Sequence, residues 1–182
     1  MKQFIQQVVE NNNFKPVRLL AILREVQSKF LYISKDAIEI VAELLNIERT
    51  QIISVIEFYS FFHLQPRGQY DILISDSITD LMMEKQSLIE YLSTQLNVEI
   101  GTVREDGLVS LGNTSCTGMC DQGPAGLING YALTCLSKQR IDEIVSLIKQ
   151  QLPLNNWPKQ LFQITDNIHK TNLLLETEIS QG

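Results

Sequence analysis

The residues best suited to chemistry are two cysteines, Cys116 and Cys120, separated by three residues. They lie in the stretch NTSCTGMCDQGPAGLINGYALTCL (113–136), which also holds several glycines. Glycines let the backbone approach a cofactor closely, and successive N–H groups can point at an anionic centre. The spacing fits half of an iron–sulfur site, a redox dithiol, or a thiol pair left from a lost site. Because an iron–sulfur cluster normally needs four thiolates, the choice depends on a second cysteine pair.

No other side chain completes such a site by sequence alone. Cys135 lies in a predicted strand between leucines, where a thiol is usually a small buried hydrophobic residue. His63 closes an aromatic cluster and His169 lies near the C-terminus, so we expect a surface or core role for each. The absence of a CxxC motif weakens the case for a thioredoxin-like dithiol. With no P-loop and no GxGxxG, the chain shows no nucleotide site and no independent catalytic site.

Composition narrows the classes of function. The 182 residues carry a net charge of −6, which argues against nucleic acid because phosphate binding needs clustered Lys and Arg. No run of apolar residues is long enough to span a membrane. Residues 1–10 show no export signal, so we expect a cytoplasmic protein whose three cysteines are reduced thiols.

The elements that must position the cysteines differ before and after Pro66. Before Pro66, apolar residues at helical spacing predict a helix after Pro16, a second capped by Ser34, and a third from about Glu48. The third runs into the aromatic cluster FYSFFHL (58–64), which we interpret as packing between helices. Residues 1–66 are therefore predicted to form a helical bundle.

After Pro66 the predicted strands alternate with helices. We predict a buried strand at 69–75, a helix at 83–97 and strands at 105–111 and 125–136. Asn129-Gly130 marks a hairpin within the last of these, and Ser137 caps a final helix, 138–152. This order predicts a small α/β domain over residues 67–152. Residues 153–182 have little periodicity, and we expect them to wrap the domain or dock on a partner.

Two stretches carry a family resemblance. CTGMCDQGPAGLINGYALTCLSKQRIDEIVSLI (116–148) closely resembles the second half of the thioredoxin-like [2Fe–2S] subunit of respiratory complex I, the 24-kDa-type subunit. NIERTQIISVIEFYSFFHLQPRGQYDI (46–72) resembles the same family's helical bundle and its entry into the first strand. The same domain occurs in the diaphorase parts of NAD-reducing hydrogenases and NAD-dependent formate dehydrogenases. The resemblance covers about residues 15–150 and implies a thioredoxin-like ferredoxin domain behind a small helical bundle.

The resemblance also implies what the cluster site should contain. The family holds its [2Fe–2S] cluster with two cysteine pairs, of which Cys116 and Cys120 match the second. At the first pair this sequence reads SDSITD (75–80), so Ser75 and Asp80 stand where thiolates are expected, with the spacing intact. Oxygen is a harder ligand than thiolate and suits iron–sulfur chemistry poorly. We therefore predict that the chain binds no cluster; the alternative is a [2Fe–2S] centre held by Cys116 and Cys120 with Ser75 and Asp80, or with outside ligands.

The function implied is that of an accessory or structural subunit in a multi-subunit NAD(H)-dependent flavin and iron–sulfur oxidoreductase. FMN, NAD and further iron–sulfur clusters would belong to partner subunits, and the aromatic cluster or the tail would serve docking. SDSITD with TSCTGMCDQGP looks most like the domain at the front of the flavin subunit of NAD-reducing hydrogenases. Two alternatives stay open: an electron-transfer subunit with a working [2Fe–2S] cluster, and a thiol oxidoreductase acting through Cys116 and Cys120.

Overall fold

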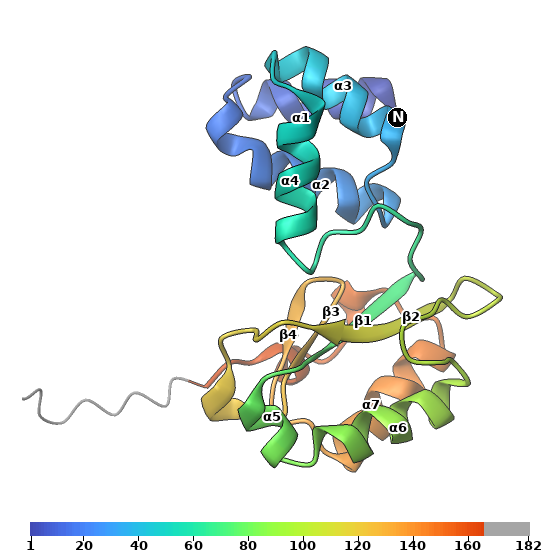
Figure 1. Cartoon of the computed structure of the whole chain (residues 1–182). Helices are drawn as coiled ribbons and strands as arrows, with labels where there is room; N and C mark the ends of the chain where they lie inside the picture. The colour runs from blue at the N-terminus through green and yellow to red at the C-terminus, as the bar shows by residue number, and fades with distance from the viewer. Residues whose placement is uncertain (166–182) are drawn as a thin grey trace, which may run out of the picture.

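Four helices form the N-terminal part of the chain, and a four-stranded sheet with its helices forms the rest (Figure 1). The computed structural model describes residues 1–165. The helices are α1 (Lys2–Asn11), α2 (Leu19–Phe30), α3 (Lys35–Leu45), α4 (Arg49–Phe58), α5 (Ile78–Met82), α6 (Lys85–Leu96) and α7 (Lys138–Lys149). The strands are β1 (Tyr70–Ser75), β2 (Val109–Thr114), β3 (Gly126–Ile128) and β4 (Tyr131–Leu133). Short 3-10 helices span Pro16–Arg18, Cys120–Gln122, Leu154–Asn156 and Lys159–Phe162.

The helical bundle follows from the apolar periodicity of the sequence. The Ser34 hydroxyl accepts a hydrogen bond from the Ala37 N–H and begins α3, as predicted. Helix α1, which was not predicted, packs against α2 and α3. The apolar faces of the four helices meet in one core that includes Ile5, Val9, Ile22, Leu23, Val26, Val41 and Ile52.

The sheet has the strand order β2-β1-β3-β4. Strand β1 pairs in parallel with β2 and antiparallel with β3, and β3 and β4 form a hairpin. The hairpin turns at Asn129-Gly130, whose φ angles of 47° and 82° place both residues in the left-handed region that a two-residue turn requires. The predicted order of a helical bundle followed by an α/β domain is therefore confirmed. Strand β2 starts later than expected, because residues 105–108 form the turn that precedes it.

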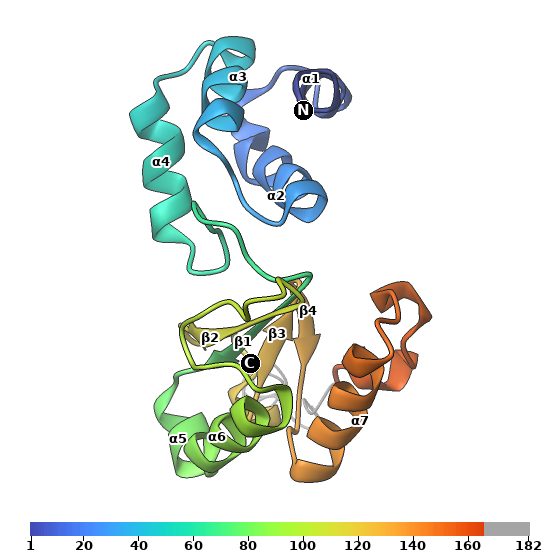
Figure 2. The ribbon, with the colours of Figure 1, turned by 90° about the vertical axis from the view of Figure 1, so that its right-hand side faces the viewer.

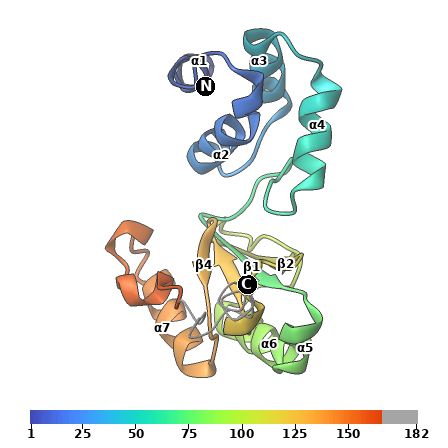
Figure 3. The ribbon, with the colours of Figure 1, turned by 90° about the vertical axis from the view of Figure 1, so that its left-hand side faces the viewer.

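Alternation along β1 gives the sheet two different faces. Tyr70, Ile72 and Ile74 enter a core shared with α6 and α7, which both lie on the side of the sheet away from the bundle (Figure 2). Asp71 and Leu73 face the opposite way, toward the linker and the bundle. The chain passes from the bundle to the sheet once, between α4 and β1 (Figure 3).

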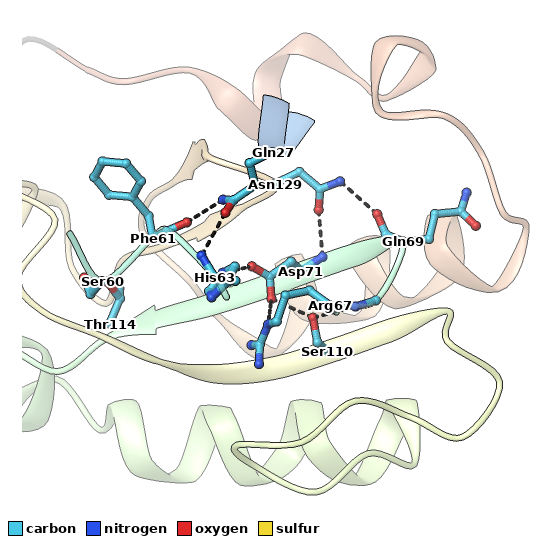
Figure 4. A network of polar contacts seen from close by, with 11 residues as sticks. Gln27, Ser60, Phe61, His63, Arg67, Gln69, Asp71, Ser110, Thr114 and Asn129 are labelled. Carbon is cyan, nitrogen blue, oxygen red and sulfur yellow. Dashed lines mark hydrogen bonds and ion pairs between the residues drawn. The ribbon is translucent and has the colours of Figure 1, made fainter. Parts of the chain in front are cut away.

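A polar network fixes that passage (Figure 4). The Gln27 side chain of α2 donates to the Phe61 carbonyl at 2.6 Å and accepts from the His63 N–H at 2.8 Å. The His63 Nε2 lies 2.7 Å from Asp71 Oδ2, and the Arg67 Nε donates to Asp71 Oδ1 at 2.8 Å. Asp71 thus connects the linker to the first strand, and the linker is connected in turn to the bundle.

The segment after Pro153 packs onto the α/β domain as far as it is described. Trp157 and Leu161 are buried in the domain core, and Trp157 stacks on Tyr70 with ring centroids 5.9 Å apart. The docking role expected of the tail stays a prediction, and its last seventeen residues, His169 among them, lie outside the described residues. Within residues 1–165, no helix is both long and apolar enough to cross a membrane.

Candidate functional site

The two cysteines lie side by side in the loop after β2. Cys116 is exposed, and Cys120, partly buried, begins the 3-10 helix Cys120–Gln122. Their sulfur atoms are 3.2 Å apart, and the Gly118 N–H donates to the Cys116 sulfur at 3.4 Å. Gly118 has a φ of +79°, a conformation that glycine adopts without strain. The loop backbone therefore brings the two thiols close together.

Ser75 and Asp80, the positions of the missing thiolates, are both 1% exposed. Ser75 ends β1, and Asp80 lies in the short helix α5 that follows. The peptide of Ala125 joins them: its carbonyl accepts from the Ser75 N–H at 2.9 Å, and its N–H donates to Asp80 Oδ1 at 2.9 Å. The other Asp80 oxygen accepts from the Ser77 hydroxyl, which also caps α5. The Asp80 carboxylate is thus held by hydrogen bonds within the protein.

The two loops of the site are in contact. A Cβ atom on Gly123 would lie 2.9 Å from Asp80 Oδ1 and 2.8 Å from the Met83 sulfur, so glycine is needed for this close approach. Hydrogen bonds from the Thr79 hydroxyl first, then from the Cys116 thiol, lower the pKa of the Cys120 thiol below its usual value. The negative Asp80 opposes this shift. Cys120 therefore contacts the loop that carries Ser75 and Asp80.

Sequence reasoning missed three contributors to this site: Ser77, Thr79 and Ala125. The signal for Ser77 was present, since a serine three residues before an acidic residue is a pattern of helix starts. The roles of Thr79 and Ala125 arise from contacts across more than 40 positions of sequence, which no local pattern reveals. Among charged neighbours, the buried Lys85 donates to Asp76 at 2.7 Å and holds the start of the same loop.

The remaining candidates stay apart from the cysteine pair. The prediction for Cys135 was wrong: it lies after β4 with a φ of 47° and is exposed, because the strand ends at Leu133 and the chain turns outward. His63 belongs to the linker network. Among the residues described, no group of three or more His, Cys, Asp or Glu side chains is arranged to hold a metal ion.

These donors do not fit a [2Fe–2S] cluster. Two thiols converge, but the other two positions offer a serine hydroxyl and a carboxylate. Iron–sulfur clusters are held by thiolates, or by imidazole on one iron, and oxygen is a poor substitute. The Asp80 oxygens already accept from Ala125 and Ser77, so iron would compete with those hydrogen bonds for the carboxylate.

The model of the thioredoxin-like [2Fe–2S] ferredoxin family matches residues 5–149. The chain belongs to this family. It is 26% identical over 129 residues to NADH-quinone oxidoreductase subunit 2 of Thermus thermophilus, an alignment covering 70% of this chain and 71% of that subunit. It is 28% identical over 150 residues to the NAD-reducing hydrogenase HoxS subunit alpha of Cupriavidus necator, covering 82% of this chain and 25% of that subunit.

A solved structure extends the likeness to the fold. A chain in the crystal structure of an NAD⁺-reducing [NiFe]-hydrogenase in the air-oxidized state superposes with a TM-score of 0.75 and 30% identity. The match covers 87% of this chain and 27% of that chain. This member of the thioredoxin-like [2Fe–2S] ferredoxin family therefore spans most of the quinone-oxidoreductase subunit but about a quarter of the HoxS alpha subunit and of the crystallised hydrogenase chain.

Proposed function

We propose that this chain is an accessory subunit, without a cluster of its own, of a cytoplasmic NAD(H)-dependent oxidoreductase built from several subunits. The observation that supports the proposal is the family fold with an altered donor set. Its Asp80 carboxylate accepts from the Ala125 N–H and the Ser77 hydroxyl. The relatives are subunits of NADH-quinone oxidoreductases and NAD-reducing hydrogenases, which supports a multi-subunit setting.

The partner we propose is a flavoprotein subunit that binds FMN, NAD(H) and iron–sulfur clusters, as the family resemblance implies. The surface that supports docking is the outer side of α5. Ile78, Leu81 and Met82 are all at least half exposed there, next to the cysteine loop. Gln122 of that loop also exchanges two hydrogen bonds with Thr165, so Thr165 lies beside the cysteine loop. In the aromatic cluster Phe62 is buried and Phe58 exposed, so Phe58 offers a second apolar contact.

Two substitutions test the docking surface. Ile78→Lys and Met82→Lys place a charge on side chains that are 78% and 82% exposed, so the fold should tolerate them. When these variants are purified from the native host, the flavoprotein partner should no longer co-purify with them. Val17→Lys, at an equally exposed site on the bundle, should retain it. Equal recovery of the partner with all three variants would show that α5 is not the docking surface.

Iron analysis tests the absence of a cluster. Anaerobically purified chain should contain far less than two irons per molecule and show no rhombic EPR signal after reduction. The double substitution Ser75→Cys/Asp80→Cys restores four thiolates at the family positions and should bind iron on reconstitution. Two irons per wild-type chain with a reducible signal would instead support the alternative, an electron-transfer subunit with a [2Fe–2S] cluster. That alternative is favoured by the retained pair Cys116 and Cys120.

A further inference from the structure

Cys116 opens onto a cavity of about 540 Å³ between the bundle and the sheet. One side comes from α2 and the end of α4, including Leu20, Arg24 and Phe58, and the other from the cysteine loop and the β3–β4 hairpin. Within the described part of the chain, Arg24 is the only charged residue that lines the cavity. Cys116 therefore lines a space that admits a small molecule and favours negative charge.

The two thiols are placed to form a bond with each other. Their sulfurs are 3.2 Å apart, and a disulfide requires about 2.05 Å. Gly118 lies between the two cysteines with a φ of +79°, and its N–H donates to the Cys116 sulfur at 3.4 Å, so the loop backbone already holds the two thiols together. Cys135 is exposed at a separate position and is not needed for the reaction.

We propose that Cys116 and Cys120 form a reversible redox dithiol that exchanges with an anionic low-molecular-weight disulfide of the glutathione type. The cavity admits the small molecule, Arg24 attracts its carboxylates, and the neighbouring sulfur completes the exchange. The inference extends the proposed function and rests on it in one respect, since both thiols must be free of iron.

The exchange takes two steps. The exposed Cys116 sulfur attacks the small disulfide; a Cys116–S–S–R bond forms, the R–S–S–R bond breaks, and one RSH leaves with the Cys116 proton. The Cys120 sulfur then attacks the Cys116 sulfur, and the second RSH leaves with the Cys120 proton. Two protein thiols are oxidised to one disulfide and one small disulfide is reduced to two thiols, so the reverse reaction uses the same partners.

The test uses the full chain in a Cys135→Ser background, which leaves only the pair. Iron content is measured first. The protein is then incubated anaerobically with glutathione and glutathione disulfide at defined ratios. Its free thiols are alkylated, and its intact mass is measured by mass spectrometry. We expect both thiols to disappear together with no glutathione retained. Cys120→Ser in the same background should instead accumulate a single glutathione adduct on Cys116.

Charge gives the second readout. Arg24→Glu should slow the reaction with glutathione disulfide by about three- to tenfold at low salt and should not slow the reaction with cationic cystamine. Lys29→Glu makes the same change in net charge on the same helix, outside the cavity lining, and should behave like the parent.

The outcomes separate the two proposals. Two irons per chain would contradict the cluster-free function, and with it the free dithiol. An iron-free chain that stays reduced, or carries only glutathione adducts, would overturn the dithiol alone. Equal rates for Arg24→Glu and Lys29→Glu would overturn the preference for an anionic disulfide.

Discussion

Replacing Asp80 by alanine should destabilise the α/β domain by about 3 kcal/mol. The side chain is 1% exposed, and its loss leaves the buried Ala125 N–H without the acceptor that now lies at 2.9 Å. Hydrogen bonds to charged groups contribute about 1.5–3 kcal/mol, and an unpaired buried donor is costly in itself. The loss of the Ser77 contact weakens the cap of α5 as well.

The matched control is Asp80→Asn. An amide oxygen can still accept from Ala125 N–H, so this variant should lose only about 1 kcal/mol. Trp157, the single tryptophan, reports the transition, because it is 4% exposed in the core of the same domain. Urea unfolding followed by its fluorescence should order the free energies of unfolding as wild type, Asp80→Asn, Asp80→Ala. Coincident curves for wild type and Asp80→Ala would refute the structural role given to this carboxylate.

Four further substitutions concern stability, and each is measured by the same unfolding assay. Ser75→Ala should change the free energy of unfolding by less than about 0.5 kcal/mol, because the buried Ser75 hydroxyl has no hydrogen-bond partner within residues 1–165. Ser110→Ala should lower the free energy of unfolding by about 1–2 kcal/mol, because the Ser110 hydroxyl accepts from the Gly68 N–H and donates to Asp71. Burial acts to raise the pKa of Asp71, but His63, Ser110 and Arg67 together lower it below the usual value of 3.8. The ionised Asp71 carboxylate therefore stabilises the fold above pH 3.8, and this stabilisation is lost as the pH falls through the lowered pKa of the folded state. In Asp71→Asn the free energy of unfolding should therefore fall less steeply as the pH is lowered. The same steepness as in the wild type would count against the network. Gly123→Ala should cost about 1–3 kcal/mol, because the added methyl meets the Asp80 carboxylate, and a neutral result would mean that the loops separate easily.

Local pattern predicted much of the fold. Ser34 and Ser137 begin α3 and α7, and Asn129-Gly130 turns the hairpin, because caps and tight turns depend on a few neighbouring residues. Helix α5 was not predicted, since its five residues are too few to show a period and its outer side is apolar. The expectation for Cys135 failed because a flanking pair of leucines does not reveal where a strand ends.

The candidate site was predictable in its members and less so in its contacts. The spacing of Cys116 and Cys120, with the resemblance, pointed to Ser75 and Asp80 as the substituted positions. That Ala125 joins these two positions could not be foreseen, because both hydrogen bonds connect segments far apart in sequence.

The anchoring of Asp80 bears on how such a domain could regain sulfur chemistry. Asp80→Cys alone would weaken the acceptor for Ala125 while still offering one thiolate too few, and Ser75→Cys alone would leave the carboxylate in place. Asp80→Cys is predicted to bring a folding cost and Ser75→Cys no gain in iron binding, so neither single change completes four thiolates. The hydrogen bonds around one buried carboxylate thus act as a barrier to reversal.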